Sequence, residues 1–153
     1  MTRLEQLYDE AYDQGIEIYD FLSKGRIHGL YCDGTIALSK TDTPIQKTCV
    51  LAEELGHHYT TSGDILDLTD VSNRKQEYRA RLWAYNKMIG LSGIIASYRA
   101  GCRTMDDMAN YLDVTEAFLL EALKCYRSKY GLYTQFDNYV IYFEPSIGVF
   151  ELI

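Results

Sequence analysis

Three ionisable side chains in the segment 51–60 have a spacing that could support catalysis if the segment is helical. Residues i and i+4 share one face of an α-helix, so Glu53 and His57 form a pair, with Glu54 about 100° around the helix. In the H-E-x-x-H arrangement, two residues four apart hold Zn²⁺ and an adjacent glutamate polarises the bound water. Glu53 occupies the place of the first ligand here. The segment therefore has the spacing of a metal site in which Glu54 would polarise the bound water.

A second register is present, because Glu54 and His58 are also four residues apart. In that register Leu55 would follow the first ligand, and leucine cannot act as a base. The pairing of Glu53 with His57 is therefore chemically better, and we expect His58 near the site or on the surface. Asp64 could orient a ligand histidine through its other ring nitrogen, or it could be a loop residue after Gly63.

A third ligand has to come from another segment, and Glu77 is the only acidic residue between positions 73 and 104. Ala80 and Ala84 follow it at i+3 and i+7, so one face of its helix is small enough for close approach to a neighbour. Glu77 could alternatively be a surface residue paired with Arg81 at i+4. Glu–His pairs at i, i+4 are also common on solvated helices, so both readings stay open on the residues alone.

The elements that would position these side chains can be read from periodicity and turn residues. Thr43, Pro44 and Gln46 form a good helix start, with an N-cap, a first-turn proline and a capping-box partner. That helix should run to about Tyr59, and Asn73 can cap the next. Apolar spacing and the Asp33-Gly34 turn predict a preceding helix and a small antiparallel sheet. The predicted ranges are helices 3–14, 44–59 and 74–89, and strands 16–19, 29–32 and 35–38.

The second half of the chain reads as mostly helical with a β-ending tail. Helices are expected near 93–99, 105–112 and 115–129, and the tail 132–153 is expected to form a β-meander. The segment 105–120 has the apolar spacing of a helix-turn-helix. Its second helix begins Thr115-Glu116 and carries Glu121, and these acids would repel phosphate. The segment is therefore interpreted as a structural helical hairpin, with protein binding as a second use.

Composition restricts the class of protein further. The chain has 153 residues with 47% hydrophobic and 24% charged, which is ordinary for one globular domain. Its net charge of −7 argues against direct nucleic-acid binding, although residues 73–104 carry seven basic side chains. That basic block could meet an acidic partner or neutralise its acidic flanks.

Cellular location is inferred from what the sequence lacks. No apolar run approaches the ~20 residues of a membrane helix, and the first residues show no secretory signal. The four cysteines form no C-x-x-C pair. We therefore expect a cytoplasmic protein with reduced thiols and no membrane partner.

The segment 49–84 resembles the ImmA/IrrE family of metallopeptidases, many of which are encoded on prophages and mobile elements. The family pattern is A-H-E-L-G-H on one helix, a polar connector, and then E-x-x-A followed by an aromatic-alanine pair. The matching parts are Ala52-Glu53-Glu54-Leu55-Gly56-His57, then Glu77 to Ala80, then Trp83-Ala84. The segments 59–64 and 73–76 also look like the phage branch of the family.

The resemblance implies roles for individual residues. Glu54 would be the general base, His57 and Glu77 would be metal ligands, and Glu53 stands where the family has its first histidine. Two carboxylates and one imidazole can bind Zn²⁺, and the hard oxygen ligands make Mn²⁺ more competitive. Three alternatives remain: a working site with Glu53 as ligand, a weak metal site, or a peptidase fold that only binds.

The resemblance also implies a fold and a substrate class. The fold would be an α+β, zincin-like single domain with a small antiparallel sheet, an active-site helix, a helical second half and a C-terminal β-meander. Its regions would be residues 1–90 as the peptidase-like core, 91–131 as the acidic helical hairpin and 132–153 as the meander. The implied activity is cleavage of a helix-turn-helix repressor of the same element. The alternative is a module that inactivates the repressor without cutting it.

Overall fold

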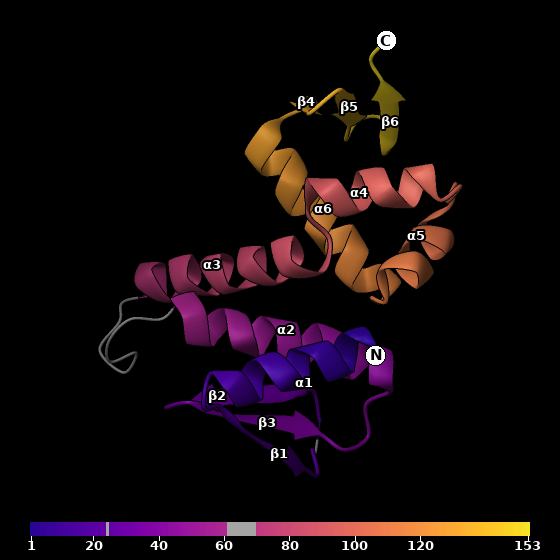
Figure 1. The fold of residues 1–153 in the computed structure, drawn as a ribbon. Coiled ribbons are helices and arrows are strands. Elements are labelled where there is room, and N and C mark those ends of the chain that lie inside the picture. The colour runs from indigo at the N-terminus through magenta and orange to yellow at the C-terminus, as the bar shows by residue number, and fades with distance from the viewer. Residues whose placement is uncertain (24, 61–69) are drawn as a thin grey trace. The chain divides into compact units, whose positions relative to one another are not determined.

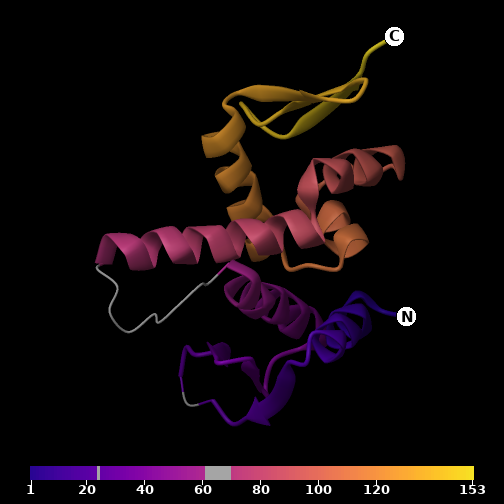
Figure 2. The same cartoon turned by 60° about the vertical axis from the view of Figure 1, so that its left-hand side comes forward.

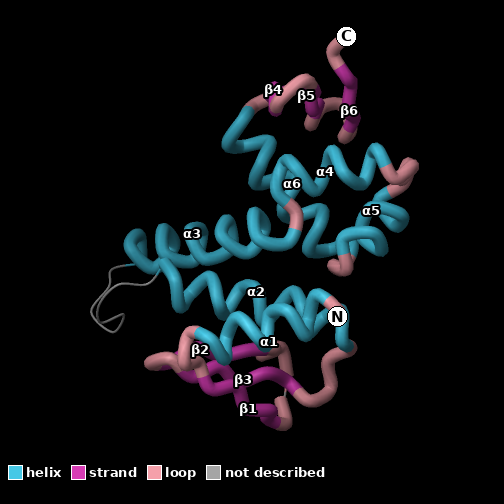
Figure 3. Tube along the Cα trace, viewed as in Figure 1, coloured by secondary structure: helices cyan, strands magenta, loops and turns pink. Residues whose placement is uncertain are grey.

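Helices and short strands follow one another in the order that the sequence patterns predict (Figures 1 and 3). The computed structural model describes residues 1–23, 25–60 and 70–153. The fold class is α+β, as predicted. The elements up to residue 88 are α1 (Arg3–Asp13), β1 (Glu17–Phe21), β2 (Gly29–Cys32), β3 (Thr35–Ser39), α2 (Pro44–Thr60) and α3 (Asp70–Met88).

The chain divides into two compact units, Met1–Ala84 and Tyr85–Ile153. The division falls inside α3, six residues before the end of the region 1–90 that the sequence suggested. The expectation that all regions join in one domain stays a prediction. The remaining elements are α4 (Gly90–Arg99), α5 (Met105–Leu112), α6 (Glu116–Tyr130), β4 (Tyr133–Phe136), β5 (Tyr139–Tyr142) and β6 (Gly148–Glu151).

The sheet of the first unit has β3 at its centre, in the order β1-β3-β2. The hairpin β2–β3 is antiparallel, and Asp33 and Gly34 adopt the positive φ values of 47° and 76° that its two-residue turn requires. β1, however, pairs with β3 in parallel. The prediction of a wholly antiparallel sheet was therefore wrong for this pair, because an alternating pattern identifies a strand without fixing its direction.

Two helices, α1 and α2, cover one face of this sheet (Figures 1 and 2). Ile36 and Leu38 point from β3 into the core and are fully buried, as are Leu51 and Leu55 of α2. Burial of each such side chain stabilises the fold by about 1.5–3 kcal/mol. This packing fixes α2 above the sheet and determines which of its side chains face β2.

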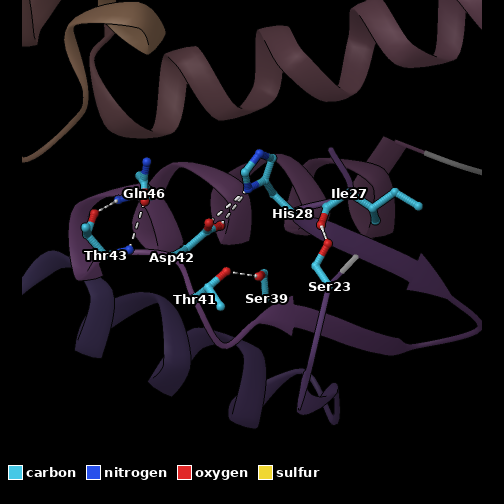
Figure 4. A network of polar contacts seen from close by, with 8 residues as sticks. All are labelled: Ser23, Ile27, His28, Ser39, Thr41, Asp42, Thr43 and Gln46. Atoms are coloured by element: carbon cyan, nitrogen blue, oxygen red, sulfur yellow. Dashed lines mark hydrogen bonds and ion pairs between the residues drawn. The ribbon is translucent and has the colours of Figure 1, made fainter. Parts of the chain in front are cut away.

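The predicted capping box at the start of α2 is present (Figure 4). The backbone N–H of Gln46 donates to Oγ1 of Thr43 at 3.2 Å, and the backbone N–H of Thr43 donates to Oε1 of Gln46 at 2.9 Å. Two backbone donors at the helix end are thus satisfied.

The two helices after α2 start earlier than expected. α3 begins at Asp70 rather than after Asn73. α4 begins at Gly90 rather than near residue 93, because the positive φ of Gly90 ends α3 and starts the next helix within one residue. The earlier start of α3 places Glu77 about two turns inside the helix rather than one.

The second unit packs α4, α5 and α6 with the three-stranded meander β4-β5-β6, which the sequence predicted. Its core includes Ile94, Leu119, Tyr126 and Ile141, all fully buried. No helix in the described part of the chain is long and apolar enough to cross a membrane.

Candidate functional site

Helix α2 presents neighbouring side chains to two different elements. His57 faces α3, where its Nε2 lies 3.1 Å from Oε2 of Glu77. Glu54 and His58 face β2 instead, through contacts with Gly29 and Tyr31 respectively. The pairing of His57 with Glu77 corresponds to the register of Glu53 with His57, and His58 is directed elsewhere.

The approach of α3 to α2 depends on a glycine that the sequence analysis did not single out. A Cβ atom built on Gly56 would lie 2.3 Å from the carbonyl oxygen of Ala80, so no larger residue fits between the two helices. Ala80 and Ala84 are fully buried, as expected for a small-residue face. This close crossing is what brings Glu77 within reach of His57.

A second close approach places Glu54 against the sheet. A Cβ atom on Gly29 of β2 would lie 3.2 Å from Oε1 of Glu54 and 2.5 Å from Cγ1 of Val50. The missing side chain at Gly29 therefore leaves room for the Glu54 carboxyl group beside β2. The sequence analysis did not single out Gly29, although a glycine in a strand can mark a close approach by other atoms.

These elements enclose a pocket of about 530 Å³. Its walls come from β2, α2 and the first half of α3. The lining side chains and backbone include Gly29, Tyr31, Glu54, His57, Gln76 and Glu77. Glu54, His57 and Glu77, three of the predicted site residues, thus share one pocket.

Burial controls the protonation of Glu54. Desolvation, opposed by the charge of His57 and assisted by the negative charges of Glu53 and Glu77, raises the pKa of Glu54 to about 7. A carboxyl group with a pKa near neutrality can both accept and donate a proton at physiological pH. Perturbed carboxyl groups of this kind mark candidate catalytic positions.

The charges of Glu53, His57 and Glu77 also influence one another. Burial raises the pKa of Glu53, and Arg81 opposes this shift. The hydrogen bond to Glu77 raises the pKa of His57, and the same bond lowers the pKa of Glu77. Arg81 donates through Nε to Oε1 of Glu77 at 3.1 Å. Glu77 thus pairs with both His57 and Arg81, which includes the surface pairing considered from the sequence.

The fit of a metal ion can be tested on this donor set. Two ligands about 2.1 Å from one tetrahedral zinc ion lie about 3.4 Å apart, and His57 and Glu77 are separated by 3.1 Å. Within the described ranges, however, no three His, Cys, Asp or Glu side chains are grouped to hold a metal. The pair fits two corners of a site, and Glu53 has the right chemistry for the third but would have to turn toward the pair.

The remaining predicted residues have different positions. His58 contacts Tyr31, with its Nδ1 atom 2.8 Å from the tyrosine hydroxyl. Asp64 lies outside the described residues, so its suggested orienting role stays a prediction. Tyr31 was missed by the sequence reasoning, although strand alternation places it on the same face as Gly29.

A separate polar network supports the start of β2 (Figure 4). Nδ1 of His28 lies 2.9 and 3.1 Å from the two carboxylate oxygens of Asp42, and the Asp42 side chain is only 6% exposed. The backbone N–H of Ser39 donates to the carbonyl oxygen of His28. His28 therefore joins the start of β2 to the loop before α2.

One of three comparisons with known proteins finds a match. The model of the IrrE N-terminal-like domain, a peptidase family, matches residues 13–124. This range includes all the elements that line the pocket. Searches of curated proteins and of solved structures find no match. Because the family model covers most of the chain, the protein belongs to the family of IrrE N-terminal-like peptidase domains.

Proposed function

We propose that the protein is a metal-dependent endopeptidase that cleaves a helix-turn-helix repressor of a prophage or other mobile element. The observation that carries the proposal is the pocket in which Glu54, with a pKa of about 7, lies beside the His57–Glu77 pair. Family membership supports the peptidase class. Cleavage of the repressor would release the genes of that element from repression.

The position of β2 supports binding of an extended substrate. β2 is at the edge of its sheet and pairs with β3 along one side, and its residues line the pocket. A peptide can add to such an edge as a further strand, with main-chain hydrogen bonds that tolerate many sequences. A scissile peptide bond held there would lie beside Glu54.

The protein side chains divide the chemical work. Glu54 accepts a proton from the attacking water and then donates it to the amine that leaves, which a carboxyl group with a pKa near 7 can do. His57 and Glu77, joined by Glu53, would hold Zn²⁺ or Mn²⁺. The bound metal supplies Lewis acidity toward the substrate carbonyl. The burial of Glu54 keeps its carboxyl group partly protonated and therefore able to act in both steps.

A second function, repressor binding without cleavage, is favoured by two observations. Among residues 1–23, 25–60 and 70–153, no three potential ligands are grouped for a metal, and Arg81 already pairs with Glu77. A protein of this kind would use the same edge of β2 to capture the repressor. It would inactivate the repressor by holding it.

A cleavage assay with a matched pair of variants separates the two functions. The wild type and Glu54→Gln would each be incubated with Zn²⁺ or Mn²⁺ and a repressor of the element that carries the gene. We expect mass spectrometry to show cleavage by the wild type and at least a hundredfold slower cleavage by Glu54→Gln. Glu121→Gln, an exposed change on α6, is the control and should cleave normally.

A reporter gene controlled by the same repressor provides the deciding result. If Glu54→Gln relieves repression as fully as the wild type, the peptidase proposal is wrong and the binding function replaces it. If neither protein relieves repression of any repressor tested, both functions on this substrate class are contradicted.

A further inference from the structure

Tyr31 is held at the wall of the pocket by two hydrogen-bonding partners. Its hydroxyl lies 2.8 Å from Nδ1 of His58, and it accepts from the backbone N–H of Gly34 at 3.3 Å. The rings of Tyr31 and His58 also meet edge to face, with centroids 5.6 Å apart. A phenol held by two polar contacts and one ring contact has little freedom to rotate, and Tyr31 is one of the residues that line the pocket.

The hydrogen-bonding capacity of the phenol leaves one contact available. A tyrosine hydroxyl has one proton to donate and two lone pairs to accept with. Gly34 uses one lone pair, since a backbone N–H can only donate. His58 uses either the proton or the second lone pair, depending on its tautomer. In both cases one further hydrogen bond can form, and Tyr31 lines the substrate pocket.

His58 is itself fixed by aromatic packing. Its ring lies edge to face with Tyr59, at a centroid distance of 5.3 Å, and Tyr59 packs against Trp83 of α3 at 4.9 Å. Successive rings therefore run from α3 across α2 to Tyr31 on β2. This arrangement sets the position of the His58 imidazole independently of any ligand in the pocket.

We propose that the Tyr31 hydroxyl binds the main chain of a peptide in this pocket and that His58 is its positioning residue. The proposal rests on the proposed function, because it assumes that the pocket receives an extended peptide. It gives His58 a role that does not involve a metal. An extended backbone offers N–H and C=O groups alternately. It can therefore donate or accept the one further hydrogen bond of the Tyr31 hydroxyl, whichever tautomer His58 adopts.

The test uses peptide binding, which does not depend on hydrolysis. The probe is fluorescein-labelled β-casein, an unfolded chain that offers extended segments of many sequences. Fluorescence anisotropy would give its Kd for the full-length protein in a Glu54→Gln background, which prevents cleavage. One lost hydrogen bond predicts that Tyr31→Phe weakens binding about three- to tenfold. Tyr19→Phe removes a comparable hydroxyl from β1, where Tyr19 donates to Glu17, and should leave Kd unchanged.

A double-mutant cycle distinguishes positioning from a merely structural contact. His58→Phe should weaken binding as much as Tyr31→Phe, and the double variant should be no weaker than either single variant, because both remove the same contact. His58→Asn, whose amide can reach the position of Nδ1, should restore most of the affinity. Thermal unfolding of each variant shows whether it is folded, and the Asn variant keeps the test valid if the Phe variant is not.

Several outcomes would overturn the proposal. They are an unchanged Kd for Tyr31→Phe, additive losses in the double variant, or no casein binding by the Glu54→Gln parent, since a main-chain contact is tolerant of sequence. Failure of the proposed function gives a different result. In that case casein binds and depends on Tyr31 and His58, but the protein with Glu54 intact never cleaves casein or a repressor.

Discussion

Burial and the surrounding charges both shift the pKa of the Glu54 carboxyl group. Desolvation and the nearby carboxylates raise its pKa to about 7, whereas the charge of His57 lowers it. The sequence predicted Glu54 and its neighbours as candidates from helical spacing alone. It could not predict the burial that tunes Glu54, because this depends on Gly29, which lies 25 positions away along the chain.

The raised pKa of Glu54 has a consequence for stability in protein without metal. An unfolded glutamate ionises near pH 4.5, so the fold carries a cost of ionisation that develops as the pH rises from about 4.5 through 7. Glu54→Gln removes the cost. We expect the variant to gain about 1–3 kcal/mol of unfolding free energy at pH 8 and almost none at pH 4, measured by urea denaturation with a chelator present. An equal gain at both pH values would contradict the assigned burial.

The His57–Glu77 pair stabilises the fold between two pH limits, and its contribution to the unfolding free energy falls at low and at high pH. The lowered pKa of Glu77 contributes stability that is lost as the pH falls below about 4.5, and the raised pKa of His57 contributes stability that is lost as the pH rises above about 6.5. Because the Glu77 side chain is 42% exposed, Glu77→Gln should cost only about 0.5–1 kcal/mol near pH 6, and less at pH 9.

The control for this pair is Arg81→Gln, which removes the other partner of Glu77. Arginine stays charged over this range, so the cost of that change should be the same at pH 6 and pH 9. A Glu77→Gln cost that is also constant would show that His57 and Glu77 do not interact in solution.

At the scale of elements, α2 positions the site because it contacts a strand and a helix at the same time. The capping box of Thr43 and Gln46, the helix itself and the small face at Ala80 and Ala84 were all predictable, since they depend on local sequence. The parallel pairing of β1 with β3 and the contact of Tyr31 with His58 were not. Both depend on segments that meet only through packing, which periodicity does not encode.

The crossing of α2 and α3 gives a prediction at this scale. Alanine normally stabilises a helix interior relative to glycine by up to about 1 kcal/mol. Gly56→Ala should instead destabilise the protein by about 2–3 kcal/mol in urea denaturation, because its Cβ would meet the backbone of Ala80. Gly93→Ala in α4 is the matched control. There the new Cβ meets the end of the Leu112 side chain at 3.3 Å and Cγ2 of Ile89 at 3.9 Å, and no backbone atom, so the change should be within about 1 kcal/mol. A neutral Gly56→Ala would contradict the close crossing.

At the scale of the whole molecule, charge determines which partners are suitable. The net charge of −7 and the acidic start of α6 oppose phosphate binding, although α5 and α6 have the spacing of a helix-turn-helix. We therefore expect no shift of duplex DNA in a gel assay at low salt, where electrostatic binding is strongest. Salt-sensitive binding at micromolar protein would contradict this and would favour a DNA-binding function.

The proposed peptidase activity requires that residues of α2 and α3 hold a metal ion beside Glu54. Elemental analysis would be made on untagged protein purified without chelators and then supplied with Zn²⁺ or Mn²⁺. We predict about one equivalent of metal in the wild type and in His58→Ala, and almost none in His57→Ala or Glu77→Ala. A wild type without metal, or a loss of metal in His58→Ala as large as in His57→Ala, would contradict the claim.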